Sequence, residues 1–235
     1  MSVQQGKNVV IGDDVTFGEN VMIGNNVVIY EGTIIGDNSI IQDNAVIGKQ
    51  PTRAKASILP EVNKLPPAII GKGVTVGTSA IIYANAEIAD EVFIADLATV
   101  RERVTIGEAT IVGRGVAVEN DCTVGKRCKL ETNCYITAYS EIGDYVFIAP
   151  CVVTTNDNYM GRSKERFDHF KGVTIKDGGR IGANSTILPG KVIHEDGVVG
   201  AASVVSRDVG KEELVVGTPA KKVRNVPENQ LLKNQ

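Results

Sequence analysis

Residues 104–124 read VTIGEATIVGRGVAVENDCTV, and an aliphatic residue recurs in this stretch at every sixth position. The spacing continues in both directions without a break, so that all fourteen positions from Ile70 to Ile148 in steps of six are aliphatic. A period of six fits neither the 3.6-residue helix nor the two-residue alternation of a strand. It is typical of a parallel β-helix, in which each hexapeptide supplies one short strand and one corner, and three hexapeptides close one coil.

The residue four places after each aliphatic is small or β-branched, as at Val74, Ala80 and Ala86. Residues 18 apart then stack on the same face, and the stacked coils bury a continuous column of like side chains. Gly often follows the aliphatic residue, as at Gly71 and Gly77. We expect these glycines to supply the positive φ that a corner needs.

The six-residue row also runs from Ile11 to Ile47 and from Ile181 to Val205, and two irregular segments interrupt it. We therefore expect an all-β chain in which residues 1–210 form the β-helix, with insert loops at 49–69 and 154–180. Loops of this length in a compact fold are usually functional. Residues 211–235 read as a C-terminal tail with a short helix after Pro227, and the block lengths predict about eight coils.

Composition excludes several classes of protein. The net charge of −3 and the pI near 5.5 predict no nucleic-acid partner. The first ten residues lack the pattern of a signal peptide, and no run of 18 apolar residues predicts a membrane span. Cys122, Cys128 and Cys134 occupy inward small positions, so we expect reduced core thiols rather than disulfides or metal ligands. Reduced thiols suit a cytoplasmic protein.

The repeat, the extruded loop and the ending VVGTPAKKVR (215–224) resemble the hexapeptide-repeat acyltransferases. More narrowly, GKQP (48–51), IADLATVRE (94–102) and TTNDNYMGR (154–162) are similar to nucleotide-sugar N-acyltransferases that act on dTDP-linked 4-amino-4,6-dideoxy sugars, as in anthrose biosynthesis. The resemblance implies a left-handed β-helix, a homotrimer with active sites between subunits, and acyl-CoA as co-substrate. It implies no metal.

Asp96 lies two residues after the inward Ile94, and register stacks it with Thr78, Arg114 and Thr132. The resemblance implies that Asp96 is the general base for the sugar amine. Asp is also common at β-helix corners, where Asp90 offers a purely structural parallel.

Register places Arg101 with Tyr83 and Glu119, and Glu102 with Asn120. One interpretation is a solvated Arg–Glu ladder. The other is that Tyr83, Arg101 and Asn120 contact the substrate while Glu102 contributes to catalysis.

One departure from the resemblance concerns Ala86, where similar proteins lead us to expect a hydroxyl residue that bonds the substrate or the base.

The second insert carries four further candidates for the substrate, which reach nucleotide or sugar groups at a neighbouring subunit: Asn156, Asn158, Tyr159 and Arg162. An Asx-rich turn is the alternative. For CoA the resemblance implies contacts from the small Ala183 and Ala201 and from the cationic Lys221 and Arg224. A merely solvated basic run is the alternative for the last two.

Other functions remain in view. An O-acetyltransferase of a sugar or small hydroxyl acceptor would need a His base, and the chain has only His169 and His194. A γ-class carbonic anhydrase needs three His ligands for zinc and is excluded. A non-catalytic β-helix, such as a scaffold or an ice-binding protein, is the last alternative. An ice-binding protein would show regular Thr-rich faces without long loops, whereas this chain has two loops and irregular outward residues.

Overall fold

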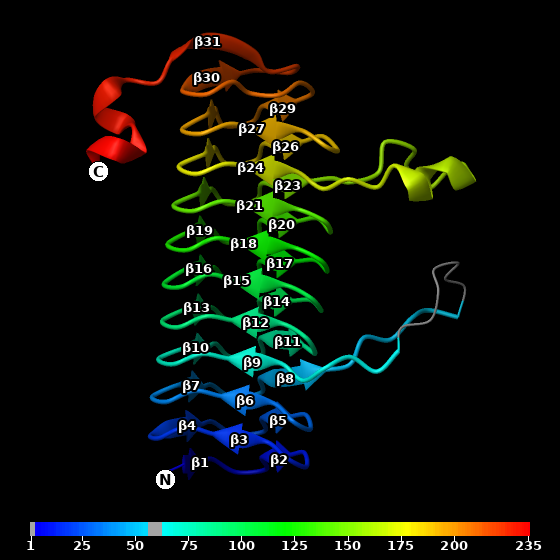
Figure 1. Ribbon diagram of the computed structural model, residues 1–235, viewed down its shortest axis with the longest axis vertical. Helices are drawn as coiled ribbons and strands as arrows, with labels where there is room; N and C mark the ends of the chain where they lie inside the picture. Colours follow the sequence, from blue (N-terminus) through cyan, green and yellow to red (C-terminus); the bar gives the residue numbers. More distant parts are fainter. Residues whose placement is uncertain (1–2, 56–62) are drawn as a thin grey trace.

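Each aliphatic residue of the six-residue row ends a short strand and points into the interior of a triangular helix. In β13 (Phe93–Ile94), for example, Phe93 faces outward and Ile94 is fully buried. The computed structural model describes residues 3–55 and 63–235, and it shows these strands stacked into a tall prism (Figure 1). The buried residues of all three faces form one continuous aliphatic core.

Successive strands alternate among three sheets, here named A, B and C. Sheet A holds β1 (Val3–Gln5), β4 (Val21–Ile23), β7 (Ile40–Ile41), β10 (Thr75–Val76), β13, β16 (Ile111–Val112), β19 (Lys129–Leu130), β22 (Phe147–Ile148), β25 (Arg180–Ile181), β28 (Val198–Val199), β30 (Glu213–Val216) and β31 (Lys221–Asn225).

Sheet B holds β2 (Val10–Ile11), β5 (Val28–Ile29), β8 (Val46–Lys49), β11 (Ile81–Tyr83), β14 (Thr99–Val100), β17 (Ala117–Val118), β20 (Tyr135–Ile136), β23 (Val153–Thr154), β26 (Thr186–Ile187) and β29 (Val204–Val205). Sheet C holds β3 (Thr16–Phe17), β6 (Ile34–Ile35), β9 (Ile69–Ile70), β12 (Glu87–Ile88), β15 (Thr105–Ile106), β18 (Thr123–Val124), β21 (Glu141–Ile142), β24 (Thr174–Ile175) and β27 (Val192–Ile193).

The parallel pairing register is the 18 residues that the sequence predicts, as in Thr75 with Phe93. The fold is thus the expected left-handed parallel β-helix of hexapeptide repeats. The expected count of about eight coils is wrong: sheet A without its antiparallel strand β31 gives about eleven turns. Four strands escape the six-residue row as read from the sequence: β1 and β30 at the two ends, and β23 and β24 on either side of the second insert. Strand β24 lies inside the range predicted as a loop.

The last residues fold back over the prism. Strand β31 runs antiparallel to β30, and two short 3-10 helices follow, η2 (Glu228–Gln230) and η3 (Leu232–Asn234). Among the residues that the structure describes, no helix has the length and apolar character needed to cross a bilayer.

Both inserts leave the prism at the same edge (Figure 1). The chain runs from sheet A to B to C in every coil, so each coil has an A–B, a B–C and a C–A edge. The first insert joins β8 to β9 and the second joins β23 to β24, and both connections cross the B–C edge. The second insert contains the 3-10 helix η1 (Lys164–Asp168). Residues 56–62 of the first insert lie outside the described part.

Except for Gly48, whose φ is +81°, the glycines after the inward residues are required for close approach rather than for positive φ, which corrects the sequence-based expectation. A Cβ on Gly77 would lie 2.5 Å from the backbone nitrogen of Asp96 in the next coil. The positive φ falls two residues later, at Ser79 in this corner and at Gly73 in the preceding one. Asn, whose short side chain tolerates this conformation, fills many equivalent positions.

The three inward cysteines are core residues, as predicted. Cys122, Cys128 and Cys134 are buried and free. Burial raises the pKa of Cys122 to about 12, that of Cys128 to about 11 and that of Cys134 to about 12. These thiols therefore stay protonated near neutral pH and act as small apolar side chains.

Replacement of Gly77 by Ala should destabilise the helix, because the added methyl meets backbone that cannot retreat without separating two coils. We expect a loss of about 1–3 kcal/mol, measured as a lower thermal midpoint by circular dichroism. Gly73→Asn is the control, since φ is +64° there and a Cβ would meet only Glu91 Cγ at 3.9 Å. Equal midpoints for the two variants would contradict this account.

Candidate active site

A buried carboxylate marks the B–C edge. The Glu102 side chain is only 2% exposed, and Arg101 holds both of its oxygens, with Nε to Oε2 at 2.8 Å and Nη2 to Oε1 at 3.1 Å. Arg101 also reaches Glu119 Oε2 through Nη1 at 3.4 Å. A charge this deeply buried is tolerated only with such pairing. The solvated-ladder interpretation is therefore wrong for Glu102.

Arg101 is also held from the other side. Its guanidinium carbon lies 4.7 Å from the centroid of the Tyr83 ring, which Lys49 approaches at 5.5 Å. An Arg placed over an aromatic face gains cation–π attraction. The two contacts lock one guanidinium plane at the edge from which the inserts leave.

Of the two carboxylates that contact Arg101, Glu119 is held less tightly, by one hydrogen bond of 3.4 Å against two shorter ones to Glu102. Burial raises its pKa, and the nearby charge of Glu102 raises it further, although Arg101 opposes both effects. Glu119 therefore takes up a proton more readily than a solvent-exposed glutamate does.

A second ion pair lies beside the first. Arg103 donates to Asp121 through Nε at 2.6 Å and Nη2 at 2.8 Å, and Asn120 Nδ2 donates to Asp121 Oδ2 at 2.6 Å. The Arg103 hydrogen bond keeps the pKa of Asp121 low despite partial burial. This arrangement fixes the direction of the Asn120 amide.

A cavity of about 380 Å³ opens between this edge and the inserts. Its lining combines the first insert (Arg53), the second insert (Asn156, Asp157, Phe170) and the prism edge (Arg103, Asn120, Ala138, Tyr139). Its volume lies in the range of sites for small molecules.

The second insert is held by its own contacts. Asp157 accepts from the backbone N–H groups of Tyr159 at 2.8 Å and Gly161 at 2.9 Å and from Arg166 Nη1 at 3.1 Å. Phe167 and Phe170 meet edge to face at 5.6 Å. The Asx-turn interpretation of this segment is correct as geometry, and the turn presents Asn156 and Phe170 to the cavity.

Sequence reasoning overlooked Arg53, Arg103, Asp121 and Tyr139 as members of the site. The last three were detectable, because Arg103, Asp121 and Tyr139 stand 18 residues apart and therefore share one column with the predicted register. Arg53 had no such signal, since it lies in an insert outside the repeat.

Asp96 lies away from this cavity within one chain, on the A–B edge. Its Oδ1 accepts from the backbone N–H of Thr78 at 2.9 Å. Five other corner aspartates make the same bond to the coil below: Asp37, Asp43, Asp90, Asp144 and Asp177. The Asp96 carboxylate therefore has the same structural role as those five, and Asp96 is exposed to solvent.

The residues expected at CoA share that edge. A column of backbone hydrogen bonds runs from Asp96 through Arg114, Thr132 and Pro150 to Ala183 and on towards Ala201. Asp96 and Ala183 are four rungs apart, roughly 19 Å at about 4.8 Å per rung. Near the last coil, Lys221 lines a cavity of about 270 Å³ with Arg207, while the exposed Arg224 donates to the Asn225 carbonyl at 3.2 Å.

The remaining candidates do not line the B–C edge cavity. Asn158 and Arg162 are exposed on the second insert, where Tyr159 stacks on His169 at 5.9 Å. His194 follows β27 on the C–A edge.

Ala86 is fully buried at an inward position. In the same column the hydroxyl groups of Thr33 and Ser140 donate to the carbonyls of Tyr30 at 2.6 Å and Thr137 at 2.7 Å. A hydroxyl in this column therefore serves the backbone rather than a ligand.

Comparison with known proteins gives a consistent but partial match. The family model for the bacterial transferase hexapeptide (six repeats) matches residues 14–49. A Schizosaccharomyces pombe protein named as an acetyltransferase is 32% identical over 93 residues, 38% of this chain and 44% of that protein. The dTDP-3-amino-3,6-dideoxy-alpha-D-galactopyranose 3-N-acetyltransferase of Aneurinibacillus thermoaerophilus is 44% identical over 54 residues, 23% of this chain and 28% of the enzyme. The chain thus spans less than half the length of these curated relatives.

The solved structures agree on the fold. The UDP-N-acetylglucosamine acyltransferase of Francisella novicida superimposes with a TM-score of 0.55 at 16% identity, covering 92% of this chain and 68% of that one. Among the described residues there is no group of three or more His, Cys, Asp or Glu side chains arranged to hold a metal ion.

Arg101→Gln should remove the one ion-pair partner that Glu102 has among the described residues and leave a buried charge. We expect destabilisation of about 3 kcal/mol, and partial recovery when Glu102→Gln is added. Thermal midpoints of the single and double variants measure this coupling. Arg103→Gln is the control, because the Arg103–Asp121 pair is about one-third exposed and should cost about 1 kcal/mol or less. Additive losses at Arg101 and Glu102 would contradict the pairing.

Proposed function

We propose that the protein is a CoA-dependent N-acyltransferase that moves an acyl group onto the amine of a dTDP-linked amino-deoxy sugar. The observation that carries the proposal is the cavity on the B–C edge, where both inserts meet a rigid array of Arg and Asn side chains. The Aneurinibacillus relative, whose name gives this substrate class, supports it. A scaffold protein has no use for two inserts converging on one such cavity.

We further propose a homotrimer in which sheet B faces the threefold axis. The outward face of sheet B is largely apolar, with Val10 and Val153 well exposed. Burying this face would place the A–B edge of one copy against the B–C edge of its neighbour. Asp96, Ala183 and Ala201 of one chain would then complete a site begun by Asn120 and Asn156 of the other.

The proposed roles follow from the side-chain chemistry. Arg53 and Arg103 suit the nucleotide diphosphate, because a guanidinium matches phosphate oxygens bidentately. Asn120 and Asn156 suit sugar hydroxyls or base edges, and Tyr83 and Arg101 form the wall beside them. Glu102, with both oxygens on Arg101, positions that residue rather than accepting a proton. Asn158, Tyr159 and Arg162 extend towards the neighbouring chain.

The proposed CoA contacts lie along the A–B edge. The small side chains of Ala183 and Ala201 leave the backbone open to the pantetheine arm. Lys221 and Arg224 offer cations to the CoA phosphates at the last coil.

The reaction requires little of its base. The neutral amine attacks the thioester carbonyl, a C–N bond forms, the nitrogen loses a proton, and the collapsing intermediate releases the CoA thiolate. If the amine has a pKa near that of an α-amino group, about 8, freeing it at pH 7 costs about 1.4 kcal/mol. The attacking nitrogen becomes far more acidic, so the carboxylate of Asp96 can accept its proton. Alignment of the two substrates supplies most of the rate. Acyl-CoA and nucleotide sugars also fit a cytoplasmic enzyme.

The substrate class is tested by offering acetyl-CoA with a panel of dTDP- and UDP-linked 3-amino and 4-amino sugars and following release of free CoA thiol. We expect turnover with a dTDP-amino sugar and none with the matching hydroxyl sugar. Turnover of the hydroxyl sugar would favour O-acetyl transfer. Absence of turnover with every amine would overturn the proposal.

The role of Asp96 is tested with a matched pair of variants, Asp96→Asn and Asp90→Asn. Both residues accept the same kind of backbone hydrogen bond, which the Asn oxygen retains. Their thermal midpoints should therefore match. If Asp96 accepts the amine proton, only Asp96→Asn lowers kcat, by about 10²-fold or more. Equal kcat values for the two variants would show that the amine loses its proton without this carboxylate.

A further inference from the structure

One cation on the A–B edge is exposed and unpaired. Arg114 lies at the corner between β16 and β17, with Gly113 and Gly115 on either side of it, and it is exposed to solvent. Within the described part of the chain its side chain makes no hydrogen bond, ion pair or ring contact, although Glu131 lies on the next rung. The guanidinium is therefore available to a group from outside the chain.

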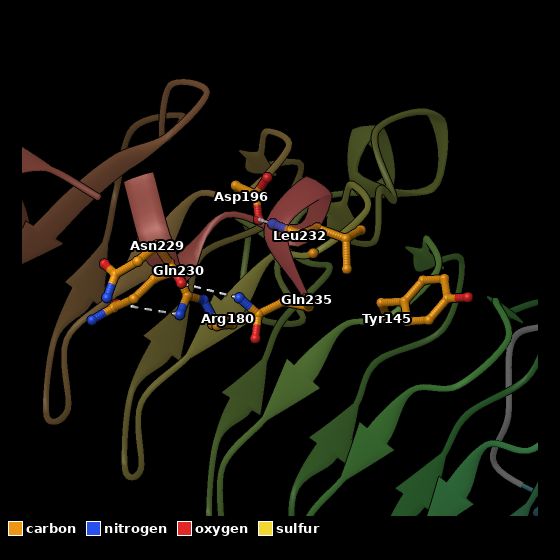
Figure 2. A pocket seen from close by; sticks show the side chains of 8 residues that line it. Tyr145, Arg180, Asp196, Asn229, Gln230, Leu232 and Gln235 are labelled. Carbon is orange, nitrogen blue, oxygen red and sulfur yellow. Dashed lines mark hydrogen bonds between the residues drawn. The ribbon is translucent and has the colours of Figure 1, made fainter. Parts of the chain in front are cut away.

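Other arginines of the prism are engaged by their own chain. Arg101 and Arg103 hold carboxylates on the B–C edge. Arg180 lies beside the C-terminal tail, where its Nη1 is 3.5 Å from Gln230 Oε1 (Figure 2). None of these contacts has a counterpart at Arg114.

Arg114 stands one rung above Asp96. The Gly115 N–H donates to the Asp96 carbonyl at 2.9 Å, so the two corners stack directly, about 4.8 Å apart. Above Arg114 the same column holds only uncharged residues, namely Thr132, Pro150, Ala183 and Ala201. Arg114 is therefore the one charged side chain of this column between Asp96 and the residues proposed for CoA.

The two neighbouring charges do not pair with each other. Asp96 Oδ1 accepts the N–H of Thr78 on the rung below at 2.9 Å. No ion pair joins the Asp96 carboxylate to Arg114 among the residues that the structure describes. An anion and a cation on adjacent rungs, both unpaired, suit a bound species that carries both signs of charge.

The acyl transfer proposed above passes through such a species. When the neutral amine attacks the thioester carbonyl carbon, a C–N bond forms and the carbonyl π electrons move onto oxygen. The tetrahedral intermediate then carries a positive nitrogen and a negative oxygen on one carbon. The nitrogen gives its proton to Asp96, the oxygen re-forms the carbonyl, and the C–S bond breaks to release the CoA thiolate. A donor aimed at the oxygen lowers the barrier, because this negative charge is absent from the substrates.

We propose that Arg114 is a catalytic residue that stabilises this oxyanion while Asp96 receives the proton, an inference that rests on the proposed function. A guanidinium stays charged at any working pH and presents several N–H donors in a fixed fork. In the proposed trimer the B–C edge of the neighbouring chain covers this edge. Exclusion of water there would strengthen the attraction between the guanidinium and the oxyanion.

Steady-state kinetics of the whole protein test the proposal, with acetyl-CoA and the dTDP-amino sugar that the wild type turns over. Arg114→Gln should lower kcat by about 10²-fold and leave KM for both substrates near the wild-type value, because the oxyanion forms only after both are bound. Arg114→Lys keeps the charge but loses the fork, so it should recover part of the loss.

Arg127→Gln is the matched control. Arg127 is also an exposed corner arginine, but it lies on the C–A edge between β18 and β19. Removing its charge should leave kcat unchanged. Because Arg114 and Arg127 are both exposed, both Gln variants should also keep the wild-type thermal midpoint.

Three results would overturn the role of Arg114 while leaving acyl transfer in place. The first is wild-type turnover with an unaltered kcat in Arg114→Gln, including the case in which only KM for acetyl-CoA rises, as expected of a cation that binds CoA phosphates. The second is an equal loss of kcat in Arg127→Gln. The third is an altered oligomeric state of Arg114→Gln by light scattering, which would indicate a subunit contact instead. Absence of wild-type turnover with every amine would overturn both this inference and the proposed function.

Discussion

The closeness of successive coils is the constraint on which the rest of the molecule depends. Each coil donates backbone N–H groups to the carbonyls of the next, with most N–O distances near 2.8–3.0 Å. That spacing explains why Gly77 admits no side chain and why corner aspartates bond the N–H one coil below. It also fixes the columns 18 residues apart that place Arg101, Glu119 and Tyr83 together. Chemistry in this fold is therefore arranged by column, and an outward side chain has few neighbours except those above and below.

The backbone path was predictable because the six-residue row reports an interior that every coil must share. The inward cysteines and the 18-residue register followed from it and are observed. The end strands escaped prediction because neither is stacked between two coils of the repeat: β1 pairs only with β4, and β30 pairs with β28 on one side and with the antiparallel β31 on the other. The prediction of positive φ at the corner glycines was wrong for most of them, because sequence alone does not distinguish a crowded corner from one with positive φ.

The candidate site was predictable only where it lies on the repeat. Register placed Arg101, Glu102 and Asn120 on one edge, and the structure shows that Glu102 is buried and paired. Arg53 and Phe170 could not be placed, because an insert has no column to fix its side chains. Asp96 shows the opposite difficulty. Its position follows from the register, but five other aspartates make the same kind of hydrogen bond, so the geometry of one chain does not distinguish a general base from a structural side chain.

The two inserts leave the same edge at β8 and β23, which are five rungs apart in sheet B. At about 4.8 Å per rung, their bases stand roughly 24 Å from each other, and the first insert must lean along the prism for Arg53 to meet the second. Such a separation changes only in whole steps, since a partial coil would turn an insert onto another edge. Gain or loss of one 18-residue coil between the inserts would lengthen or shorten the cleft by a single rung and leave every corner intact. The length of ligand that this architecture accommodates therefore changes in steps of one coil and not continuously.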